Sequence, residues 1–202
     1  LEQAGLGLSA PEIDDFIVSS CEYGVQLGNG VDSSVTAGSL VDLVGFGSTR
    51  YGIRIEPGCQ RCHVRGCNIE MSFDGVLEAI GISAAGERHD IDGNRVESSG
   101  DLVLKTKGIE ILGNKNTIRG NSVNAFGLYG IHIDPAGEKN SLSANEVTMT
   151  GIVPAAGAAV RIDGGRTAIN GGVYTQLVVP YDGPAVMITG DLCAATGLNT
   201  HV

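Results

Sequence analysis

The pattern of apolar and polar positions between residues 108 and 147 contains the same arrangement twice. Each copy opens with a short alternating run, Gly108-Ile109-Glu110-Ile111 and then Gly130-Ile131-His132-Ile133. Each copy closes with a second run, over residues 118–123 and then 142–147. Alternation with a period of two is typical of strands, and the Gly and Asn residues between the runs are typical of turns. The pattern therefore predicts a repeat built from short strands.

Both runs recur along the whole chain. The first run, small-apolar-x-apolar, starts at Gly5, Gly24, Gly52, Ala79, Gly108, Gly130, Ala159 and Ala185. The second run, close to apolar-x-small-Asn-x-apolar, starts at Val35, Val64, Ile91, Ile118, Leu142 and Ile169. A repeat of this length cannot bury its apolar face alone, so the copies must stack on one another. We therefore expect residues 1–202 to form one domain of about eight stacked turns.

The stacked repeat predicts an all-β fold. No stretch holds a helical period, and leucine-rich repeats of similar length need Leu at fixed positions. In the coil that remains, each turn carries two or three strands, and equivalent strands pair in parallel about 4.8 Å apart. The pattern Gly-Ile-x-Ile followed by Asn-x-Ile-x-Gly-Asn-x-Val resembles the parallel β-helix repeat of pectin-lyase-like enzymes and phage tailspikes. We predict a right-handed, single-stranded parallel β-helix (a solenoid).

One column of the second run is rich in asparagine. It contains Asn68, Asn94, Asn121 and Asn145, with Gly172 in the next turn. We expect a structural asparagine ladder, because Asn tolerates the left-handed backbone of a sharp corner and its amide can bond the equivalent residues above and below. Gly tolerates the same backbone.

Composition narrows the range of partners. The chain has a net charge of −10, no Trp, and 31 Gly among its 202 residues. We expect no nucleic-acid partner and no anionic membrane partner, because both need a basic protein surface. A polyanionic substrate would need a bridging cation or a local basic patch. The chain begins without Met and its stack ends look open, so we expect a piece of a longer protein. The tailspike resemblance implies a homotrimer at an extracellular or virion-associated location.

The candidate site lies on the outer face of the first run. Alternation points the x residue and the residue after the run outward. The two outward columns read Gln26, Arg54, Gly81, Glu110, His132, Arg161 and Met187, and then Gly28, Glu56, Ser83, Leu112, Asp134, Asp163 and Thr189. Charge gathers on three adjacent turns, which makes Glu110, His132, Asp134, Arg161 and Asp163 the candidate catalytic residues.

Three chemistries fit this cluster. Asp134 and Asp163 should lie about 5 Å apart on neighbouring turns, and Glu110 and Asp134 roughly 8 Å apart. Separations of about 5 Å suit a retaining glycosidase, and separations of about 6.5–9.5 Å suit an inverting one. Resemblance to pectate lyases implies a third chemistry, in which Asp134 and Asp163 hold Ca²⁺ while Arg161 acts at the sugar. Two alternatives without catalysis stay open: a charge ladder that only solubilises the face, and a surface that only binds carbohydrate.

The substrate-binding candidates are few. Arg54 lies in the outward column, and Tyr129 and Tyr174 are the aromatic candidates for stacking on a sugar ring. The paired-Asp and Gly-His-Gly motifs of polygalacturonases are absent from the sequence.

The cysteines do not indicate a cofactor. Cys59, Cys62 and His63 match a haem-attachment pattern, and Cys67 adds a third thiol. A packed coil offers no cavity for a porphyrin, and strand alternation would point zinc ligands to different sides. A local disulfide stays open, but we favour buried packing, with Cys62 aligned to Asn116 and Asn140.

The favoured function is a carbohydrate-facing module, similar to pectin-lyase-like and tailspike proteins, that binds a polysaccharide or cleaves it as a glycosidase or lyase. The alternative is a structural shaft of a virion or cell-surface spike, or an excised scaffold.

Overall fold

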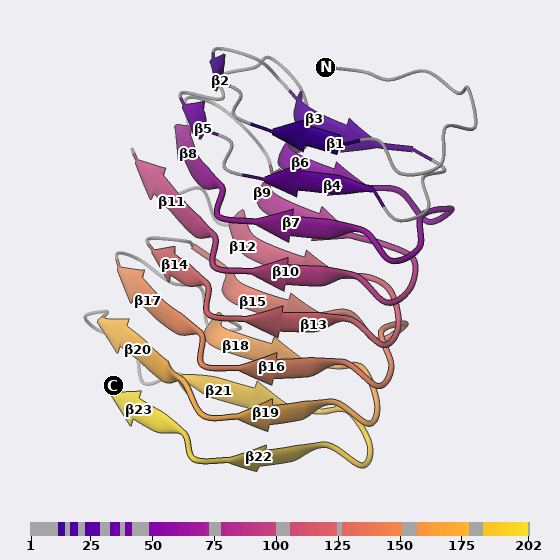
Figure 1. The fold of residues 1–202 in the computed structure, drawn as a ribbon. Coiled ribbons are helices and arrows are strands. Elements are labelled where there is room, and N and C mark those ends of the chain that lie inside the picture. Colours follow the sequence, from indigo (N-terminus) through magenta and orange to yellow (C-terminus); the bar gives the residue numbers. More distant parts are fainter. Residues whose placement is uncertain are drawn as a thin grey trace.

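The computed structural model describes residues 12–14, 17–19, 23–28, 33–36, 39–41, 49–72, 78–99, 106–124, 127–150, 157–177 and 184–201. These residues form three parallel sheets that run along one coil (Figure 1). Sheet A contains β3 (Tyr23–Leu27), β6 (Thr49–Ile55), β9 (Glu78–Ala84), β12 (Thr106–Ile111), β15 (Tyr129–Ile133), β18 (Ala158–Ile162) and β21 (Val186–Ile188).

Sheets B and C follow sheet A in each turn. Sheet B contains β1 (Glu12–Asp14), β4 (Ser34–Thr36), β7 (His63–Arg65), β10 (Asp90–Asp92), β13 (Thr117–Arg119), β16 (Ser141–Ser143), β19 (Ala168–Asn170) and β22 (Ala194–Thr196). Sheet C contains β2 (Ile17–Ser19), β5 (Ser39–Val41), β8 (Asn68–Ser72), β11 (Arg95–Ser99), β14 (Ser122–Asn124), β17 (Glu146–Thr150), β20 (Val173–Leu177) and β23 (Asn199–His201).

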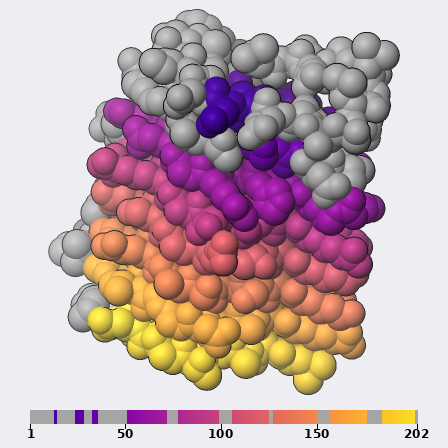
Figure 2. Space-filling model, viewed as in Figure 1, coloured from indigo at the N-terminus to yellow at the C-terminus, as the bar shows by residue number. Residues whose placement is uncertain are grey.

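The predicted all-β coil is confirmed. Seven successive triplets of strands, from β3–β5 to β21–β23, follow the pair β1 and β2. The first expected run, residues 5–8, lies outside the described residues. On the face that Figure 2 shows, the turns form closely stacked bands from one end of the coil to the other. Among the described residues, no helix is long and apolar enough to cross a membrane.

The interior is built from aligned files of apolar side chains. Ile109 pairs with Ile131, and Ile131 pairs with Val160, in the parallel register of sheet A. All three are fully buried and belong to one core cluster. The alternation read from the sequence therefore placed this file correctly, because its members share one pleat position in successive turns.

The predicted register is wrong in one turn. Gly81 was expected to point outward, but it aligns with Gly108, and the outward position belongs to Ser83. A β-carbon at Gly81 would lie 2.6 Å from the carbonyl oxygen of Gly108 and would also clash with the side chain of Val96. Only a small residue fits where the backbones of sheet A approach one another, and this requirement fixes the register.

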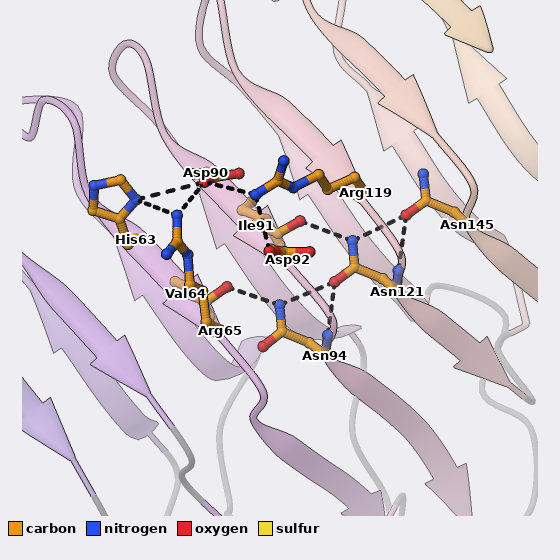
Figure 3. Close-up of polar contacts among 10 residues, drawn as sticks. All are labelled: His63, Val64, Arg65, Asp90, Ile91, Asp92, Asn94, Arg119, Asn121 and Asn145. Atoms are coloured by element: carbon orange, nitrogen blue, oxygen red, sulfur yellow. Dashed lines mark hydrogen bonds and ion pairs between the residues drawn. The ribbon is translucent and has the colours of Figure 1, made fainter.

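The second run is two strands joined by a corner. The corner residue with positive φ is the small residue before the asparagine, as at Gly93 (64°), Gly120 (61°) and Ala144 (52°). The asparagine was expected to take that conformation itself. Its side chain instead turns inward and bonds along the stack, which Figure 3 shows.

The asparagine ladder is confirmed for three of its four members. The Nδ2 atom of Asn94 donates to Oδ1 of Asn121, and Nδ2 of Asn121 donates to Oδ1 of Asn145, each at 3.0 Å. Asn68 was assigned to this column wrongly: it is exposed and pairs with Arg95 across the sheet. Cys67 takes the column position instead, and its backbone N–H donates to Oδ1 of Asn94 at 3.0 Å.

A second ladder occupies the corner between sheets A and B. The backbone N–H of Cys62 donates to Nδ1 of His89, and the N–H of His89 donates to Oδ1 of Asn116. The N–H of Asn116 then donates to Oδ1 of Asn140, so the predicted alignment of Cys62 is confirmed. Cys62, Cys59 and Cys67 are buried, and none of the three forms a disulfide with another described cysteine. In the described part of the chain, no group of three or more His, Cys, Asp or Glu could hold a metal ion.

Candidate functional site

A continuous set of polar and aromatic side chains covers the outer face of sheet A. We call it the sheet A network. Its members are Glu78, Lys107, Glu110, Tyr129, His132, Arg161, Asp163 and Thr189. The parallel register of β12, β15 and β18 places them side by side, because Glu110 pairs with His132 and His132 pairs with Arg161.

A local departure from strict alternation brings residues three apart onto this face. A β-carbon at Gly130 would point at the side chain of Val147, and the next residue, Ile131, also lies in the core. Two successive positions therefore face inward. The residues on either side, Tyr129 and His132, consequently face outward together, with ring centroids 4.7 Å apart and a tilt of 36°.

Glu110 and Lys107 form a largely buried ion pair at one end of the network. The Nζ atom of Lys107 donates to Oε1 of Glu110 and lies 3.4 Å from Oε1 of Glu78. The side chains of Lys107 and Glu110 are 13% and 8% exposed. Burial raises the pKa of Glu110, but the close contact with His132 and the hydrogen bond from Lys107 outweigh it and hold the pKa below its ordinary value. Burial likewise lowers the pKa of Lys107, but the two glutamates outweigh it, so this pKa lies above its ordinary value.

His132 lies at the centre, between two carboxylates. Its Nε2 atom is 3.2 Å from Oδ2 of Asp163, and its Nδ1 atom is 3.6 Å from Oε1 of Glu110. The side chain is 9% exposed. Such an imidazole can hold or pass a proton while the flanking carboxylates compensate its charge.

Asp163 and Arg161 form the other end. The Nε atom of Arg161 donates to Oδ2 of Asp163 at 2.7 Å, and Nη1 of Arg161 donates to the hydroxyl of Tyr129 at 2.8 Å. The Thr189 hydroxyl donates to Oδ1 of Asp163. Burial raises the pKa of Asp163, but these donors and His132 outweigh it and leave the pKa below its ordinary value. The hydrogen bond to Asp163 raises the pKa of Arg161.

A surface depression of about 400 Å³ opens beside Asp163. It lies over the turns that follow β15, β18 and β21, and it is lined by Pro135, Glu138, Asp163, Gly165, Arg166, Thr189, Gly190, Asp191 and Leu192. Asp163 and Thr189 belong both to this depression and to the sheet A network. A ligand in the depression would therefore reach the network from its Asp163 end.

The structure brings four predicted catalytic residues together and leaves one apart. Glu110, His132, Arg161 and Asp163 belong to the network, whereas Asp134 stabilises the turn after β15 by accepting the backbone N–H of Ala136 at 3.0 Å. This arrangement does not fit Ca²⁺ at Asp134 and Asp163. Both oxygens of Asp163 already accept hydrogen bonds, and the Arg161 guanidinium occupies the place of a cation.

The predicted substrate-binding residues have three different surroundings. Tyr129 lies in the network. Arg54 lies on the same face of β6, where it pairs with Glu56 at 3.1 Å and covers the Tyr51 ring at 4.7 Å. Tyr174 is fully buried and takes the core position equivalent to Val147, so it cannot stack on a sugar at the surface. The register is the same on both sides of the corner, with Ile169 opposite Leu142 and Tyr174 opposite Val147, so Tyr174 is the inward residue that closes this second run.

Lys107 and Glu78 were missed because strict alternation places Lys107 inside. The sequence did contain a signal for this position, because a glycine follows both Lys107 and Tyr129. This glycine marks the place where two successive residues face inward. Thr189 was in the outward column but carried no charge to single it out.

Comparisons with known proteins agree with this architecture. A family model described as "Right handed beta helix region" matches residues 51–171, which include about five of the turns. Among solved structures, the A-module of the mannuronan C-5 epimerase AlgE6 from Azotobacter vinelandii superposes with a TM-score of 0.64 at 12% identity. The match covers 95% of this chain and 58% of that module. A search of curated proteins gives no match.

Proposed function

The chain belongs to the right-handed β-helix family, and from the sheet A network we propose that it acts on an acidic polysaccharide. The proposed chemistry is transfer of the proton on the sugar carbon next to the carboxylate. The similar epimerase module acts on mannuronan by its name, which favours a uronate polymer as the substrate class. The trimer and the extracellular or virion-associated location stay predictions from the resemblance.

The observation that supports this chemistry is the position of His132. It lies between two carboxylates, next to the Tyr129 ring, and one hydrogen bond away from the Asp163–Arg161 pair. A carbon-bound proton beside a carboxylate becomes more acidic when a cation neutralises that carboxylate. Arg161 is the cation bonded directly to Asp163, with 24% of its side chain accessible, and it can supply this contact.

The proton steps then use groups already in contact. His132 accepts the proton from the sugar carbon, and the C–H electron pair delocalises into the carboxylate that Arg161 neutralises. If the Tyr129 hydroxyl protonates the departing glycosidic oxygen, the chain is cleaved and a C=C bond remains. If water instead delivers a proton to the same carbon from its other side, while His132 keeps the proton it accepted, the sugar is epimerised. Both outcomes begin with the same transfer to His132.

A glycosidase is less well supported. Hydrolysis by a carboxylate pair needs one carboxylic acid whose pKa is raised, so that it can protonate the leaving oxygen. The pKa values of Glu110 and Asp163 are both lowered by their cationic and hydroxyl donors. Neither group is therefore suited to the acid role.

Binding without turnover is the second candidate. Glu110 and His132 are less than one tenth exposed, and each carboxylate already has a partner within the protein. A face of this kind could bind a sugar at the depression and catalyse nothing. This candidate predicts binding that survives the loss of His132.

The deciding experiment follows the proton. The chain is incubated in D₂O with polymannuronate, polygalacturonate or neutral dextran, and NMR measures deuterium next to the carboxylate while ultraviolet absorbance measures unsaturated ends. We expect exchange or elimination with a uronate polymer, lowered by about 10²–10⁴-fold in His132→Gln. Asp92→Asn on sheet B is the matched control and should keep the rate. Absence of both signals, or an unchanged rate in His132→Gln, would reject the proposed chemistry.

A further inference from the structure

Five successive turns between sheets A and B carry a basic residue at the same position. These residues are Arg61, Arg88, Lys115, Lys139 and Arg166, and we call them the basic ridge. All five are exposed. The turns that carry them form a column along the edge of the coil where sheet A passes into sheet B, at the right in Figure 1.

Backbone hydrogen bonds hold this column in register. The N–H of Arg88 donates to the carbonyl of Asn114, the residue before Lys115, at 3.1 Å. The N–H of Lys115 donates in the same way to Glu138 at 2.9 Å, and the bond repeats in the turns above and below. The basic residues therefore follow one another at the spacing of parallel strands, and five of them span about 19 Å at roughly 4.8 Å per turn.

The backbone does not demand a basic residue here. All five have positive φ, from 53° to 62°, where Gly or Asn would be least strained. In the sixth turn Leu192 adopts a φ of 58° without a charge. Positive charge at this position is thus a property of the sequence rather than of the turn, in a chain whose net charge is −10.

The ridge retains cations available to a ligand. Lys115 pairs with Glu87 at 3.3 Å. For Arg88, Lys139 and Arg166, the described part of the chain shows no side-chain ion pair. Arg166 also lines the depression that contains Asp163, so the ridge ends at the proposed site.

We propose that the basic ridge binds a linear acidic polysaccharide lengthwise, along the axis of the coil, and leads it to the depression beside Asp163. A polyuronate carries one carboxylate per sugar, and one sugar with its linkage spans roughly the separation of two parallel strands. Duplex DNA fits less well, because it carries one charge about every 1.7 Å of its axis. This inference rests on the proposed function only for the class of sugar, because the ridge itself recognises a regularly spaced line of anions.

The test compares two triple variants of the 202-residue chain. Arg88→Asn, Lys139→Asn and Arg166→Asn are combined to remove ridge charge, because Asn tolerates the left-handed backbone. Arg65→Asn, Arg95→Asn and Arg119→Asn are combined as the control, which removes the same charge from sheets B and C. Binding to immobilised polygalacturonate and polymannuronate is measured at low and high salt, with dextran and duplex DNA in parallel.

We expect the ridge variant to bind polyuronate at least about 8-fold more weakly, at about 2-fold or more per charge, and the control to change less than about 2-fold. Salt should weaken wild-type binding more than that of the ridge variant. Equal loss in both variants, no loss in the ridge variant, or tighter ridge-dependent binding of duplex DNA would overturn the proposal. Binding is measured again in His132→Gln. Ridge-dependent binding without turnover would support this inference and reject the proposed catalysis. Turnover with binding that does not depend on the ridge would support the catalysis and reject this inference.

Discussion

Replacing Asn121 by Ala should weaken the whole central part of the coil. Asn121 is 1% exposed and lies in the middle of the asparagine ladder. Its Nδ2 atom donates to the Ile91 carbonyl at 2.9 Å and to Oδ1 of Asn145 at 3.0 Å. Its Oδ1 atom accepts from the backbone N–H and from Nδ2 of Asn94, each at 3.0 Å. Alanine removes all four bonds and offers nothing in exchange.

The expected magnitude follows from the groups left behind. The backbone N–H of Asn94 and the Ile91 carbonyl lose their side-chain partner in a buried corner. Oδ1 of Asn145 still accepts the backbone N–H of residue 121, and Nδ2 of Asn94 still donates to Val64. Two strongly affected groups at about 1–3 kcal/mol each give a loss of about 2–6 kcal/mol in the free energy of unfolding.

Urea unfolding followed by far-ultraviolet circular dichroism measures this loss, and hydrogen exchange locates it. Exchange is needed because stacked repeats can open locally without two-state behaviour. Asn68→Ala is the matched control: the residue is exposed on β8 and should change stability by less than about 0.5 kcal/mol. If Asn121→Ala costs no more than this control, the ladder does not stabilise the coil, and the energetic account of the corner is wrong.

Two further changes test the network and the fold that positions it. Gly130→Ala should lower the free energy of unfolding in urea by about 1–3 kcal/mol, because the new methyl group would clash with the core. Gly28→Ala is the control and should be nearly neutral, because a methyl group there meets nothing within 4 Å. Equal effects of the two substitutions would reject the double inward step. Glu110→Gln should destabilise the chain more at pH 7 than at pH 3. The folded pKa of Glu110 lies below its ordinary value of 4.5, so its stabilisation is present above that value and is lost as the pH falls through the folded pKa; a difference that grows toward low pH would contradict this sign.

The sequence predicted the coil well because its two runs are independent signals of one period. Ile109, Ile131 and Val160 fell into a single file as expected. The errors came from one-residue choices that periodicity does not settle. Asn68 was preferred to Cys67 for the ladder column because of its residue type. The residue that turns inward is instead the one directly after the corner residue with positive φ, and here that residue is Cys67.

The site was predictable as far as strict alternation holds. Glu110, His132 and Arg161 share one column and were found together, with Asp163 next to them. Lys107 was missed because two successive inward positions, the first of them a glycine, place Lys107 and Glu110 on the same outer face although they are three residues apart. The basic ridge was visible as a Lys or Arg three positions before the first apolar residue of five of the six second runs, but a turn position was not searched for charge.

The sheet A network is not required to build the coil, which argues for a role in chemistry. In β9, the positions equivalent to Lys107 and Glu110 hold Ile80 and Ser83, both almost fully buried, and the strand pairs on both sides without any ion pair at these positions. Buried ion pairs contribute little net stability, because desolvation offsets most of their attraction. The same backbone geometry therefore tolerates uncharged side chains at these positions, and these side chains avoid the cost of desolvating an ion pair. Three adjacent turns that place two carboxylates, two cations and an imidazole within one connected set are better explained by proton transfer than by folding.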